Sequence, residues 1–212
     1  MENLRVKRKD LEIFLTGLEG IPEPKLHLEQ YPTPARVAAN MLWNAGVDHD
    51  DIYEKNVLDL GCGTGTLAIG AAYLGARKAI GIDIDFETIQ IAKKNSEELD
   101  LNEKCDWICI NVEDCKMKDI DTVIMNPPFG MRKESVSRDR NFIEIALTLT
   151  DTIYTIIPYA DKTREFFKEH FKELGAKIDL IIQMDFEIKK QFEFHKKELH
   201  KTFVDLYRII KL

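Results

Sequence analysis

Two short segments of this chain contain residue types that could do chemistry. The first is a Gly-x-Gly-x-Gly loop at 61–65, directly after the apolar run 57–60. The second is Asn-Pro-Pro-Phe at 126–129, directly after the apolar run 122–125. In an open α/β sheet, ligands bind beyond the carboxyl ends of the strands, so both segments would lie at the same edge. The sequence therefore predicts one ligand site built from both segments.

The glycine loop favours a nucleoside ligand without phosphates. Glycines let the backbone turn tightly and approach a ligand closely. The spacing is neither the Gly-x-Gly-x-x-Gly of dinucleotide folds nor that of a P-loop, which makes a phosphate ligand less favoured. Asp83 lies 18 residues after Gly65, where a carboxylate can accept both hydroxyls of a ribose. S-adenosylmethionine fits the two features together. Taken alone, the glycines could simply form a tight turn, and Asp83 could simply cap the next helix.

The Asn-Pro-Pro-Phe segment favours methylation of a planar amine. Two prolines remove two N–H donors, so Asn126 Oδ1 and the Pro127 carbonyl present acceptors for the two N–H groups of such an amine. Phe129 could stack on a base, which is worth about 1–3 kcal/mol. No strong general base is needed, because the product cation is far more acidic than the neutral amine, and positioning and electrostatics would supply the rate. The structural alternative is a rigid turn with Phe129 in the core.

Composition limits the class of protein. The chain has 212 residues, 44% hydrophobic and 32% charged, which argues against disorder and fits one globular domain. No apolar run reaches the length of about 18 residues that a membrane-spanning helix needs, and the charged N-terminus is not a secretory signal. The net charge of −7 argues against binding nucleic acid over the whole surface, but not against a local basic patch.

Four cysteines without a signal peptide indicate reduced thiols and a cytoplasmic protein. Their spacings do not match the paired C-x2-C of zinc sites, so no metal is predicted. They are Cys62, Cys105, Cys109 and Cys115.

The elements that must position these segments alternate along the chain. Helices are expected at 7–18, 34–45, 67–74, 86–99, 141–150 and 161–174, and strands at 57–60, 79–83, 107–110, 122–125, 153–157, 178–184 and 203–210. Thr33 is expected to cap the second helix, with Pro34 in its first position. The polar stretch 131–140 is expected to be a mobile loop. Continuous apolar strands between helices predict a mostly parallel sheet covered on both faces, with the last two strands antiparallel.

Three further segments help to identify the class of enzyme to which the chain is similar. They are Glu-Gln-Tyr-Pro-Thr at 29–33, the run Val-Ile-Met-Asn-Pro-Pro-Phe-Gly at 123–130, and Phe-His-Lys-Lys at 194–197 followed by Val-Asp-Leu-Tyr-Arg at 204–208. With them the chain, from about 28 to 208, resembles the class I methyltransferases that methylate amines. Within that class it is similar to the methyltransferase-like family that makes N6-methyladenosine in small-subunit ribosomal RNA, including its archaeal relatives.

This resemblance implies a fold and a set of site residues. The fold is a Rossmann-like, seven-stranded, mostly parallel sheet with the third strand at one edge, in a single domain 1–212 whose first 46 residues are a helical extension. Asn126, Pro127, Pro128 and Phe129 would be catalytic. The implied cofactor-binding residues are Gln30, Thr33, Asp59, Gly61, Thr64, Thr66, Asp83, Asn111 and Val112. Eukaryotic members carry Asp where this chain has Asn111, and an Asn can still meet an adenine edge.

The resemblance also implies an RNA substrate and a protein partner. Basic residues that could contact RNA phosphates are Arg132, Lys133, His195, Lys196 and Lys197, although each group could instead be a solvated surface. The target base would have to be unstacked or single-stranded. The strand 107–110 would be an apolar edge, which invites pairing with another chain. Eukaryotic relatives use a small zinc-binding activator, and we expect a related partner on this edge.

Three other functions remain open from the residues. A glutamine-N5 methyltransferase would present a similar planar amide to the enzyme, but such enzymes usually carry Asn-Pro-Pro-Tyr and a separate helical N-terminal domain. A guanine-N2 methyltransferase is a second alternative. A non-catalytic ribosome-binding module with the same fold is a third, and the intact segment 126–129 argues against it.

Overall fold

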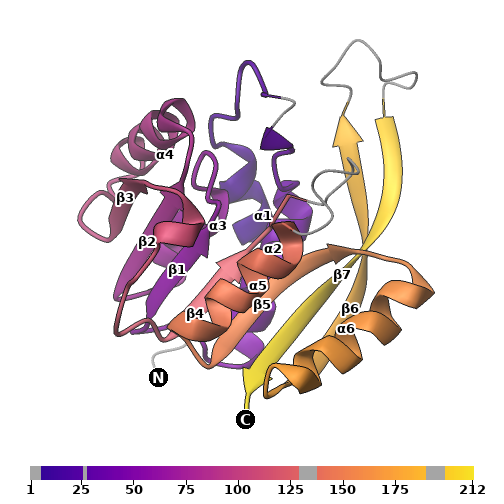
Figure 1. Ribbon diagram of the computed structural model, residues 1–212. Coiled ribbons are helices and arrows are strands. Elements are labelled where there is room, and N and C mark those ends of the chain that lie inside the picture. Colours follow the sequence, from indigo (N-terminus) through magenta and orange to yellow (C-terminus); the bar gives the residue numbers. More distant parts are fainter. Residues whose placement is uncertain (1–5, 26–27, 129–137, 190–198) are drawn as a thin grey trace.

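The computed structural model describes residues 6–25, 28–128, 138–189 and 199–212. Seven strands form one sheet in the order β3-β2-β1-β4-β5-β7-β6 (Figure 1). The strands are β1 Asn56–Leu60, β2 Lys78–Asp83, β3 Cys105–Cys109, β4 Thr122–Met125, β5 Thr152–Pro158, β6 Ala176–Lys189 and β7 Leu199–Lys211. The first five strands pair in parallel, and β7 pairs antiparallel with both β5 and β6. The predicted mostly parallel sheet with β3 at one edge is confirmed.

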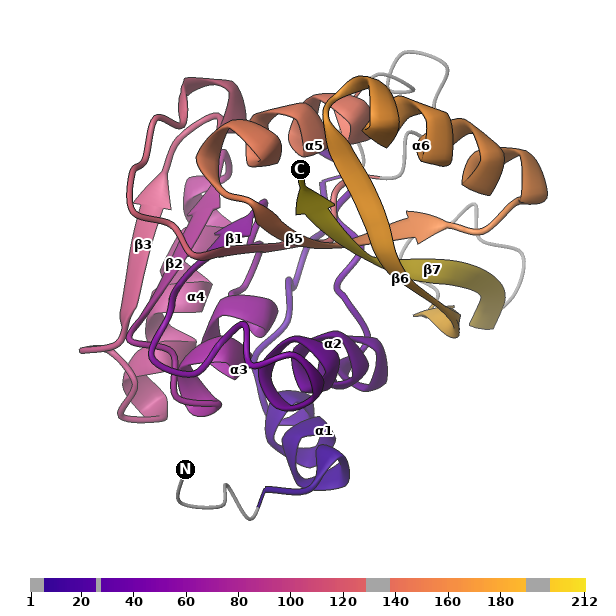
Figure 2. The same cartoon turned by 90° about the horizontal axis from the view of Figure 1, so that it is seen from below.

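Helices cover both faces of the sheet. They are α1 Arg8–Thr16, α2 Ala35–Trp43, α3 Thr66–Tyr73, α4 Phe86–Glu98, α5 Arg138–Leu149 and α6 Asp161–Glu173, with a π-helical turn η2 Asn44–Asp48 and a 3-10 turn η3 Val112–Asp114. Helices α5 and α6 lie on one face, and the other helices lie on the opposite face (Figure 2). Each face has its own apolar core, one around Leu42 and Ile69 and the other around Phe171 and Tyr207.

The N-terminal helices belong to the same core as the first βα unit. Leu11 of α1 and Leu42 of α2 are fully buried in one cluster with Ile69 of α3. Helix α1 lies within the predicted range 7–18, and its burial of Leu11 and Leu15 follows from the helical spacing of its apolar residues. The chain then returns toward the carboxyl ends of the strands before α2 begins.

Two boundaries differ from the sequence predictions for a physical reason. The predicted cap at Thr33 is wrong: Pro34, with φ −56° and ψ 136°, occupies the N-cap position of α2, and the Thr33 hydroxyl bonds elsewhere. Strands β6 and β7 extend well past 178–184 and 203–210, because their ladder continues out to the pair Lys189 and Leu199. The predicted strands stop at the first polar residues of that outer part, Asp185 and Thr202, although Phe186 within it is buried in the core.

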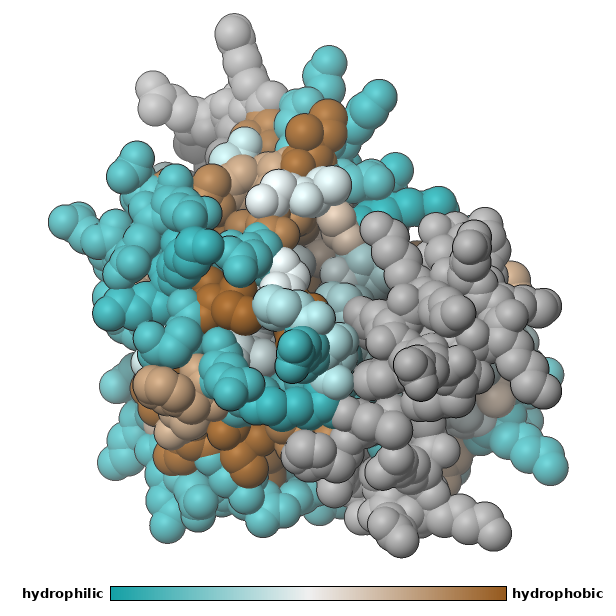
Figure 3. Space-filling view, turned by 90° about the horizontal axis from the view of Figure 1, so that it is seen from above, coloured by the Kyte–Doolittle hydropathy of each residue, from teal (hydrophilic) through white to brown (hydrophobic). Residues whose placement is uncertain are grey.

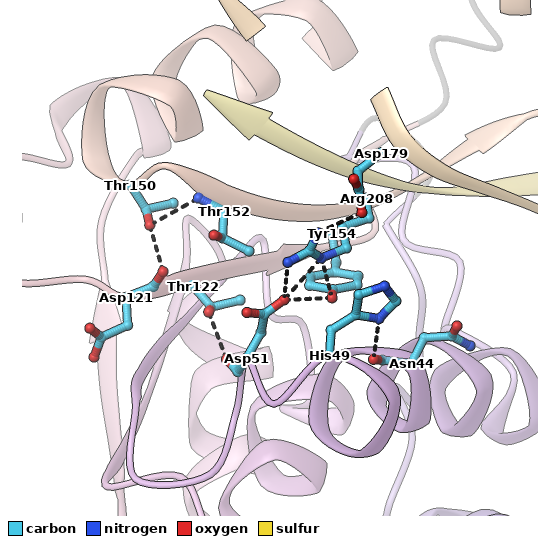
Figure 4. Close-up of polar contacts among 10 residues, drawn as sticks. All are labelled: Asn44, His49, Asp51, Asp121, Thr122, Thr150, Thr152, Tyr154, Asp179 and Arg208. Atoms are coloured by element: carbon cyan, nitrogen blue, oxygen red, sulfur yellow. Dashed lines mark hydrogen bonds and ion pairs between the residues drawn. The ribbon is translucent and has the colours of Figure 1, made fainter. Parts of the chain in front are cut away.

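The C-terminal strand is also bonded to the loop that precedes β1. Arg208 of β7 contacts Asp51, Tyr154 and Asp179 through its guanidinium group (Figure 4). None of the helices within the described ranges is long and apolar enough to span a membrane.

Candidate cofactor site and active site

A cavity of about 380 Å³ lies at the carboxyl ends of β1, β2 and β4. Figure 3 views the molecule from above, where weakly polar and apolar side chains gather between hydrophilic ones. All the residues predicted to bind the cofactor line this cavity, together with Asn126 and Pro128. The predicted set is Gln30, Thr33, Asp59, Gly61, Thr64, Thr66, Asp83, Asn111 and Val112.

The glycine loop connects β1 to α3 through backbone conformations that favour glycine. Gly61, Gly63 and Gly65 have φ values of 76°, 53° and 86°. At Gly65 a second constraint applies, because a Cβ atom would lie 2.5 Å from Cη2 of Trp107. The loop can therefore approach both a ligand and the neighbouring strand more closely than other residues would allow.

Asp83, the last residue of β2, is held at the cavity wall by two backbone groups. Its Oδ2 accepts from the Gly63 N–H at 2.8 Å, and its Oδ1 accepts from the Asp85 N–H at 2.9 Å. Burial raises the pKa of Asp83. The alternative that Asp83 caps α4 is wrong, because Asp85 is the N-cap and accepts from the Glu87 N–H at 3.1 Å. Each Asp83 oxygen retains a lone pair that suits a ribose hydroxyl.

Asp59 is a buried carboxyl group with one free oxygen. Its Oδ2 accepts from the Ala68 N–H at 3.1 Å, and its Oδ1 has no partner among the described residues. Desolvation raises the pKa of Asp59 to about 8. A buried acceptor without a partner calls for a ligand group, and a cation would satisfy it best. The ammonium of the methionine moiety of S-adenosylmethionine is such a cation.

Asn111 and Val112 stand at the turn that follows β3. The Asn111 side chain caps η3 by accepting from the Glu113 N–H at 3.2 Å. Glu113 in turn accepts from Asn141 Nδ2 at 2.7 Å, which joins this turn to α5. Cys62 lies in the glycine loop, and burial raises the pKa of its thiol, so a role in packing suits it better than a role as a nucleophile.

Asn126 follows β4, and its amide is oriented by a residue far away in the sequence. Its Nδ2 donates to Thr33 Oγ1 at 2.9 Å, and its buried Oδ1 has no partner among the described residues. Pro128 lines the cavity beside it, and Pro127 is buried. Phe129 lies outside the described residues, as do Arg132, Lys133 and 195–197 with their predicted RNA contacts, and most of the stretch expected to be a mobile loop.

Several residues that line the cavity were missed by sequence reasoning. They are Ile21, Leu28, Glu29, Tyr31, Pro32, Ile84, Glu113, Asn141 and Phe142, with others near the glycine loop. Three of them, Glu29, Tyr31 and Pro32, belong to the segment 29–33 that carries the family resemblance, and this was a signal that could have indicated them. Asn141 and Phe142 had no such signal, because only tertiary contacts bring α5 to the cavity, among them the bond from Asn141 to Glu113.

The fold and the cavity define the class of this protein. A Rossmann-like sheet and one cavity lined by the glycine loop, by Asp83 and by Asp59 are features of an S-adenosylmethionine-dependent methyltransferase. When bound, that cofactor supplies an electrophilic methyl group on a sulfonium. Asp59, Asp83 and the glycine loop are the residues of this chain that would hold it.

Comparison with known proteins gives the family. The chain is 36% identical to the rRNA N(6)-adenosine-methyltransferase METTL5 of Danio rerio, over 96% of this chain and 98% of that protein. It is 34% identical to the Drosophila melanogaster Mettl5 over 96% of both chains. The crystal structure of PH1948 from Pyrococcus horikoshii is 36% identical, superposes with a TM-score of 0.89, and covers 99% of this chain and 100% of that one. The chain therefore belongs to the METTL5-like family of methyltransferases.

A second likeness is confined to part of the chain. The family model of ribosomal protein L11 methyltransferase (PrmA) matches residues 45–127. The Escherichia coli L11 methyltransferase is 40% identical over 42% of this chain and 30% of its own length. The matched segment contains β1 to β4 and ends before Pro128, so it represents the shared cofactor-binding half.

Proposed function

We propose that this enzyme methylates the N6 amine of an adenosine in small-subunit ribosomal RNA. The observation that carries the proposal is the buried Oδ1 of Asn126 at the cofactor cavity, which has no hydrogen-bond partner within the described ranges. A hydrogen-bond acceptor in that position suits an exocyclic amine, which has two N–H groups to donate. Likeness over nearly the whole chain to relatives named rRNA N(6)-adenosine-methyltransferases supports adenosine in RNA as the substrate.

The residues of the chain would act by orientation. Asn126 Oδ1 accepts one N–H of the target amine, and the Pro127 carbonyl accepts the other, which turns the nitrogen lone pair toward the methyl donor. A nitrogen–carbon bond forms as the sulfonium–carbon bond breaks, and the resulting N6 cation loses a proton to water. Phe129 stacks on the adenine ring. The two acceptors also stabilise the positive charge that develops on N6 during transfer.

We assign RNA contacts to two groups of basic residues that the sequence places after the segment 126–129 and between β6 and β7. Arg132 and Lys133 follow the segment 126–129 in sequence, and the group His195–Lys197 lies between β6 and β7. Their role would be to neutralise phosphates without reading sequence. The double substitution of Arg132 and Lys133 by glutamine should weaken RNA binding. It should also reduce the slope of the logarithm of the binding constant against the logarithm of salt concentration by about one to two.

The deciding experiment follows the methyl group to its acceptor. Purified chain is incubated with tritiated S-adenosylmethionine and with small-subunit RNA, large-subunit RNA or ribosomal proteins, and labelled RNA is digested to nucleosides. We expect label in N6-methyladenosine from the small-subunit RNA. Protein methylation is the second candidate, because the L11 methyltransferase model matches the cofactor half. Label in glutamine, in another protein residue or in guanosine, or no label even when the chain is purified with its partners from the native source, would reject the proposal.

We further propose that a small zinc-binding activator protein docks on the edge of β3. Within the described part of the chain, β3 pairs only with β2. Ile108 on this strand is 37% exposed, and Ile84 and Phe86 at the neighbouring turn are 56% and 62% exposed. An apolar strand edge with unpaired backbone groups favours strand addition by a partner.

The two edges of the sheet provide a matched test of this partner. Ile108 on β3 and Ile181 on β6, the opposite edge strand, are both 37% exposed. Ile108→Lys should abolish co-purification of a zinc protein from the native source, and Ile181→Lys should leave it intact. A lone chain with full activity would count against an activator.

A further inference from the structure

The segment Leu28–Thr33, which we call the strap, passes along the cavity wall between the N-terminal helices. All of its residues line the cavity. Side-chain hydrogen bonds attach it at two points to parts of the sheet that are distant in sequence. One attachment is at Asp85, next to the turn that follows β2, and the other is at Asn126, after β4.

Gln30 makes the first attachment, and both ends of its amide are used. Its Nε2 donates to Asp85 Oδ2 at 2.7 Å, and its Oε1 accepts from the Lys25 N–H at 2.7 Å. Asp85 is almost fully buried, and its Oδ1 accepts from Lys25 Nζ at 2.8 Å and from the Glu87 N–H at 3.1 Å. Because each polar atom of Gln30 has a partner, this amide can bond in only one orientation.

Thr33 makes the second attachment. Its Oγ1 accepts from Asn126 Nδ2 at 2.9 Å across a separation of 93 residues. In the observed orientation of the Asn126 amide, this bond holds the NH2 group on the strap and leaves Oδ1 as the group without a partner among the described residues. The reversed amide would present N–H donors to a target amine that is itself a donor.

The strap between the two attachments has a constrained backbone. Glu29 is buried and has φ 51°, in the left-handed region that non-glycine residues rarely adopt. The Tyr31 N–H donates to the Glu29 carbonyl at 2.9 Å, which closes a tight turn. A backbone of this kind persists only where its surroundings determine it, so the strap can transmit position from one attachment to the other.

We propose that Thr33 and Asp85 are positioning residues for methyl transfer: Asp85 fixes the strap through Gln30, and Thr33 at its far end holds the Asn126 amide with the oxygen free for the target amine. This inference rests on the catalytic role given to Asn126 under the proposed function. It assigns Thr33 a bond to the catalytic amide in place of the predicted helix cap, and it gives Asp85 a function although Asp85 does not line the cavity.

The first test separates the hydroxyl of Thr33 from its shape. Thr33→Val keeps the volume and removes the acceptor, and Thr33→Ser keeps the acceptor. With ribosomal RNA as substrate, we expect Thr33→Val to lower kcat by about 10- to 100-fold, the loss that a misplaced catalytic group causes. The Kd for S-adenosylmethionine, measured by calorimetry, should rise by a smaller factor than kcat falls, although Thr33 also lines the cofactor cavity. Thr33→Ser should recover most of kcat, and the control Thr148→Val, at an exposed threonine of α5, should match wild type.

The second test addresses the remote attachment. Asp85→Asn can still cap α4 through its oxygen, but its NH2 group would face Gln30 Nε2, and turning Gln30 would then oppose its NH2 to the Lys25 N–H. We expect kcat to fall by several-fold. In the double variant Thr33→Val with Asp85→Asn, we expect the fold-loss in kcat to be smaller than the product of the two single fold-losses. The reason is that both residues act through the same strap. The control Glu98→Gln removes an exposed ion pair at the end of α4 and should have no effect.

The outcomes distinguish this inference from the proposed function. If Asn126→Ala retains transfer, the proposed catalytic role fails. If Asn126→Ala abolishes transfer while Thr33→Val turns over like wild type, the positioning role alone is overturned. A Thr33→Val enzyme with weaker cofactor binding and unchanged kcat, or a failure of Thr33→Ser to restore kcat, would also overturn it. Multiplicative losses in the double variant would reject the shared strap.

Discussion

Arg208 near the end of β7 and Asp51 in the loop before β1 are 157 residues apart in sequence, and the Arg208 Nη2 lies 2.9 Å from the Asp51 Oδ2. The same guanidinium donates through Nη1 to Asp179 Oδ2 at 2.6 Å and through Nε to the Tyr154 hydroxyl at 2.8 Å (Figure 4). These bonds join the last strand β7, its two neighbours β5 and β6, and the loop before β1. Arg208 therefore connects the C-terminal strand to a loop in the first quarter of the chain.

Removal of this guanidinium should destabilise the fold. Arg208→Met leaves two carboxylates and a phenol without their shared donor in a partly buried site, so we expect a loss of about 2–3 kcal/mol of unfolding free energy. The control Arg36→Met removes an exposed ion pair with Asp185 at 3.6 Å and should change stability by less than about 0.5 kcal/mol. Urea unfolding measures both, and equal effects would contradict the assignment.

Asn126→Ala should abolish methyl transfer while cofactor binding stays largely intact. The substitution removes the only Asn126 atom that faces the target amine, but Asp59, Asp83 and the glycine loop remain in place. Single-turnover transfer to RNA and calorimetric titration with S-adenosylmethionine measure the two quantities separately. Turnover close to wild type would remove Asn126 from the catalytic role.

Asp83→Ala should weaken cofactor binding rather than the chemical step. Hydrogen bonds to a charged group are worth about 1.5–3 kcal/mol, so the Kd for S-adenosylmethionine should rise by about 10- to 100-fold. Asp83→Asn keeps one acceptor oxygen for the backbone N–H group of Gly63 or of Asp85. This variant should therefore lose less cofactor affinity than Asp83→Ala. An unchanged affinity in calorimetry would show that the carboxylate does not meet the cofactor.

Cofactor affinity should depend on the ionisation of Asp59. With its pKa raised to about 8 by burial, this carboxyl is mainly protonated at neutral pH in the free protein. A cation bound beside it favours the carboxylate, so binding below about pH 8 releases a proton, and affinity should rise with pH by at most about tenfold per unit until pH 8. Calorimetry in two buffers of different ionisation enthalpy measures that proton, and Asp59→Asn should abolish the pH dependence. Affinity independent of pH in the wild type would contradict the assignment.

The raised pKa of Asp59 also makes the unfolding free energy of the cofactor-free protein depend on pH. Between the ordinary pKa of an aspartate, about 3.9, and the folded value of about 8, the folded state binds more protons at Asp59 than the unfolded state does. The contribution of Asp59 to stability therefore decreases as pH rises through this window. Asp59→Asn should flatten the decrease, which urea unfolding at pH 6 and pH 8 would show.

Gly81 on β2 should tolerate no larger residue, because the Trp107 ring occupies the space beside it. A Cβ atom there would lie 2.4 Å from Trp107 Cζ3 and 2.9 Å from Cys62 Sγ. Gly81→Ala should destabilise the protein by about 1–3 kcal/mol, the usual cost of overpacking, and should shift the tryptophan fluorescence. Adding Trp107→Leu should restore part of the loss, and purely additive effects would show that the ring is not the obstacle.

Much of the fold and the main parts of the site were predictable from local pattern. Apolar runs of strand length separated by helical periodicity predict a parallel sheet, and β4 was placed at its observed bounds, Thr122–Met125. Because parallel strands bring their carboxyl ends to one edge, the glycine loop, Asp83 and Asn126 were expected together, and the structure places all three at one cavity. The outer part of the β6–β7 hairpin escaped prediction because polar residues such as Asp185 and Thr202 interrupt the apolar pattern, whereas the backbone ladder continues past them.

The sequence by itself thus determined the order of the elements and the chemical groups that meet at the cofactor cavity, since hydrophobic period and turn residues act over a few neighbours. Only the tertiary structure decided which side chains bond across the chain: Thr33 with Asn126, Gln30 with Asp85 and Arg208 with Asp51. It also decided the raised pKa of Asp59, which follows from burial. Hydrogen bonds need their atoms within about 3 Å of each other, and packing sets that distance for residues far apart in sequence.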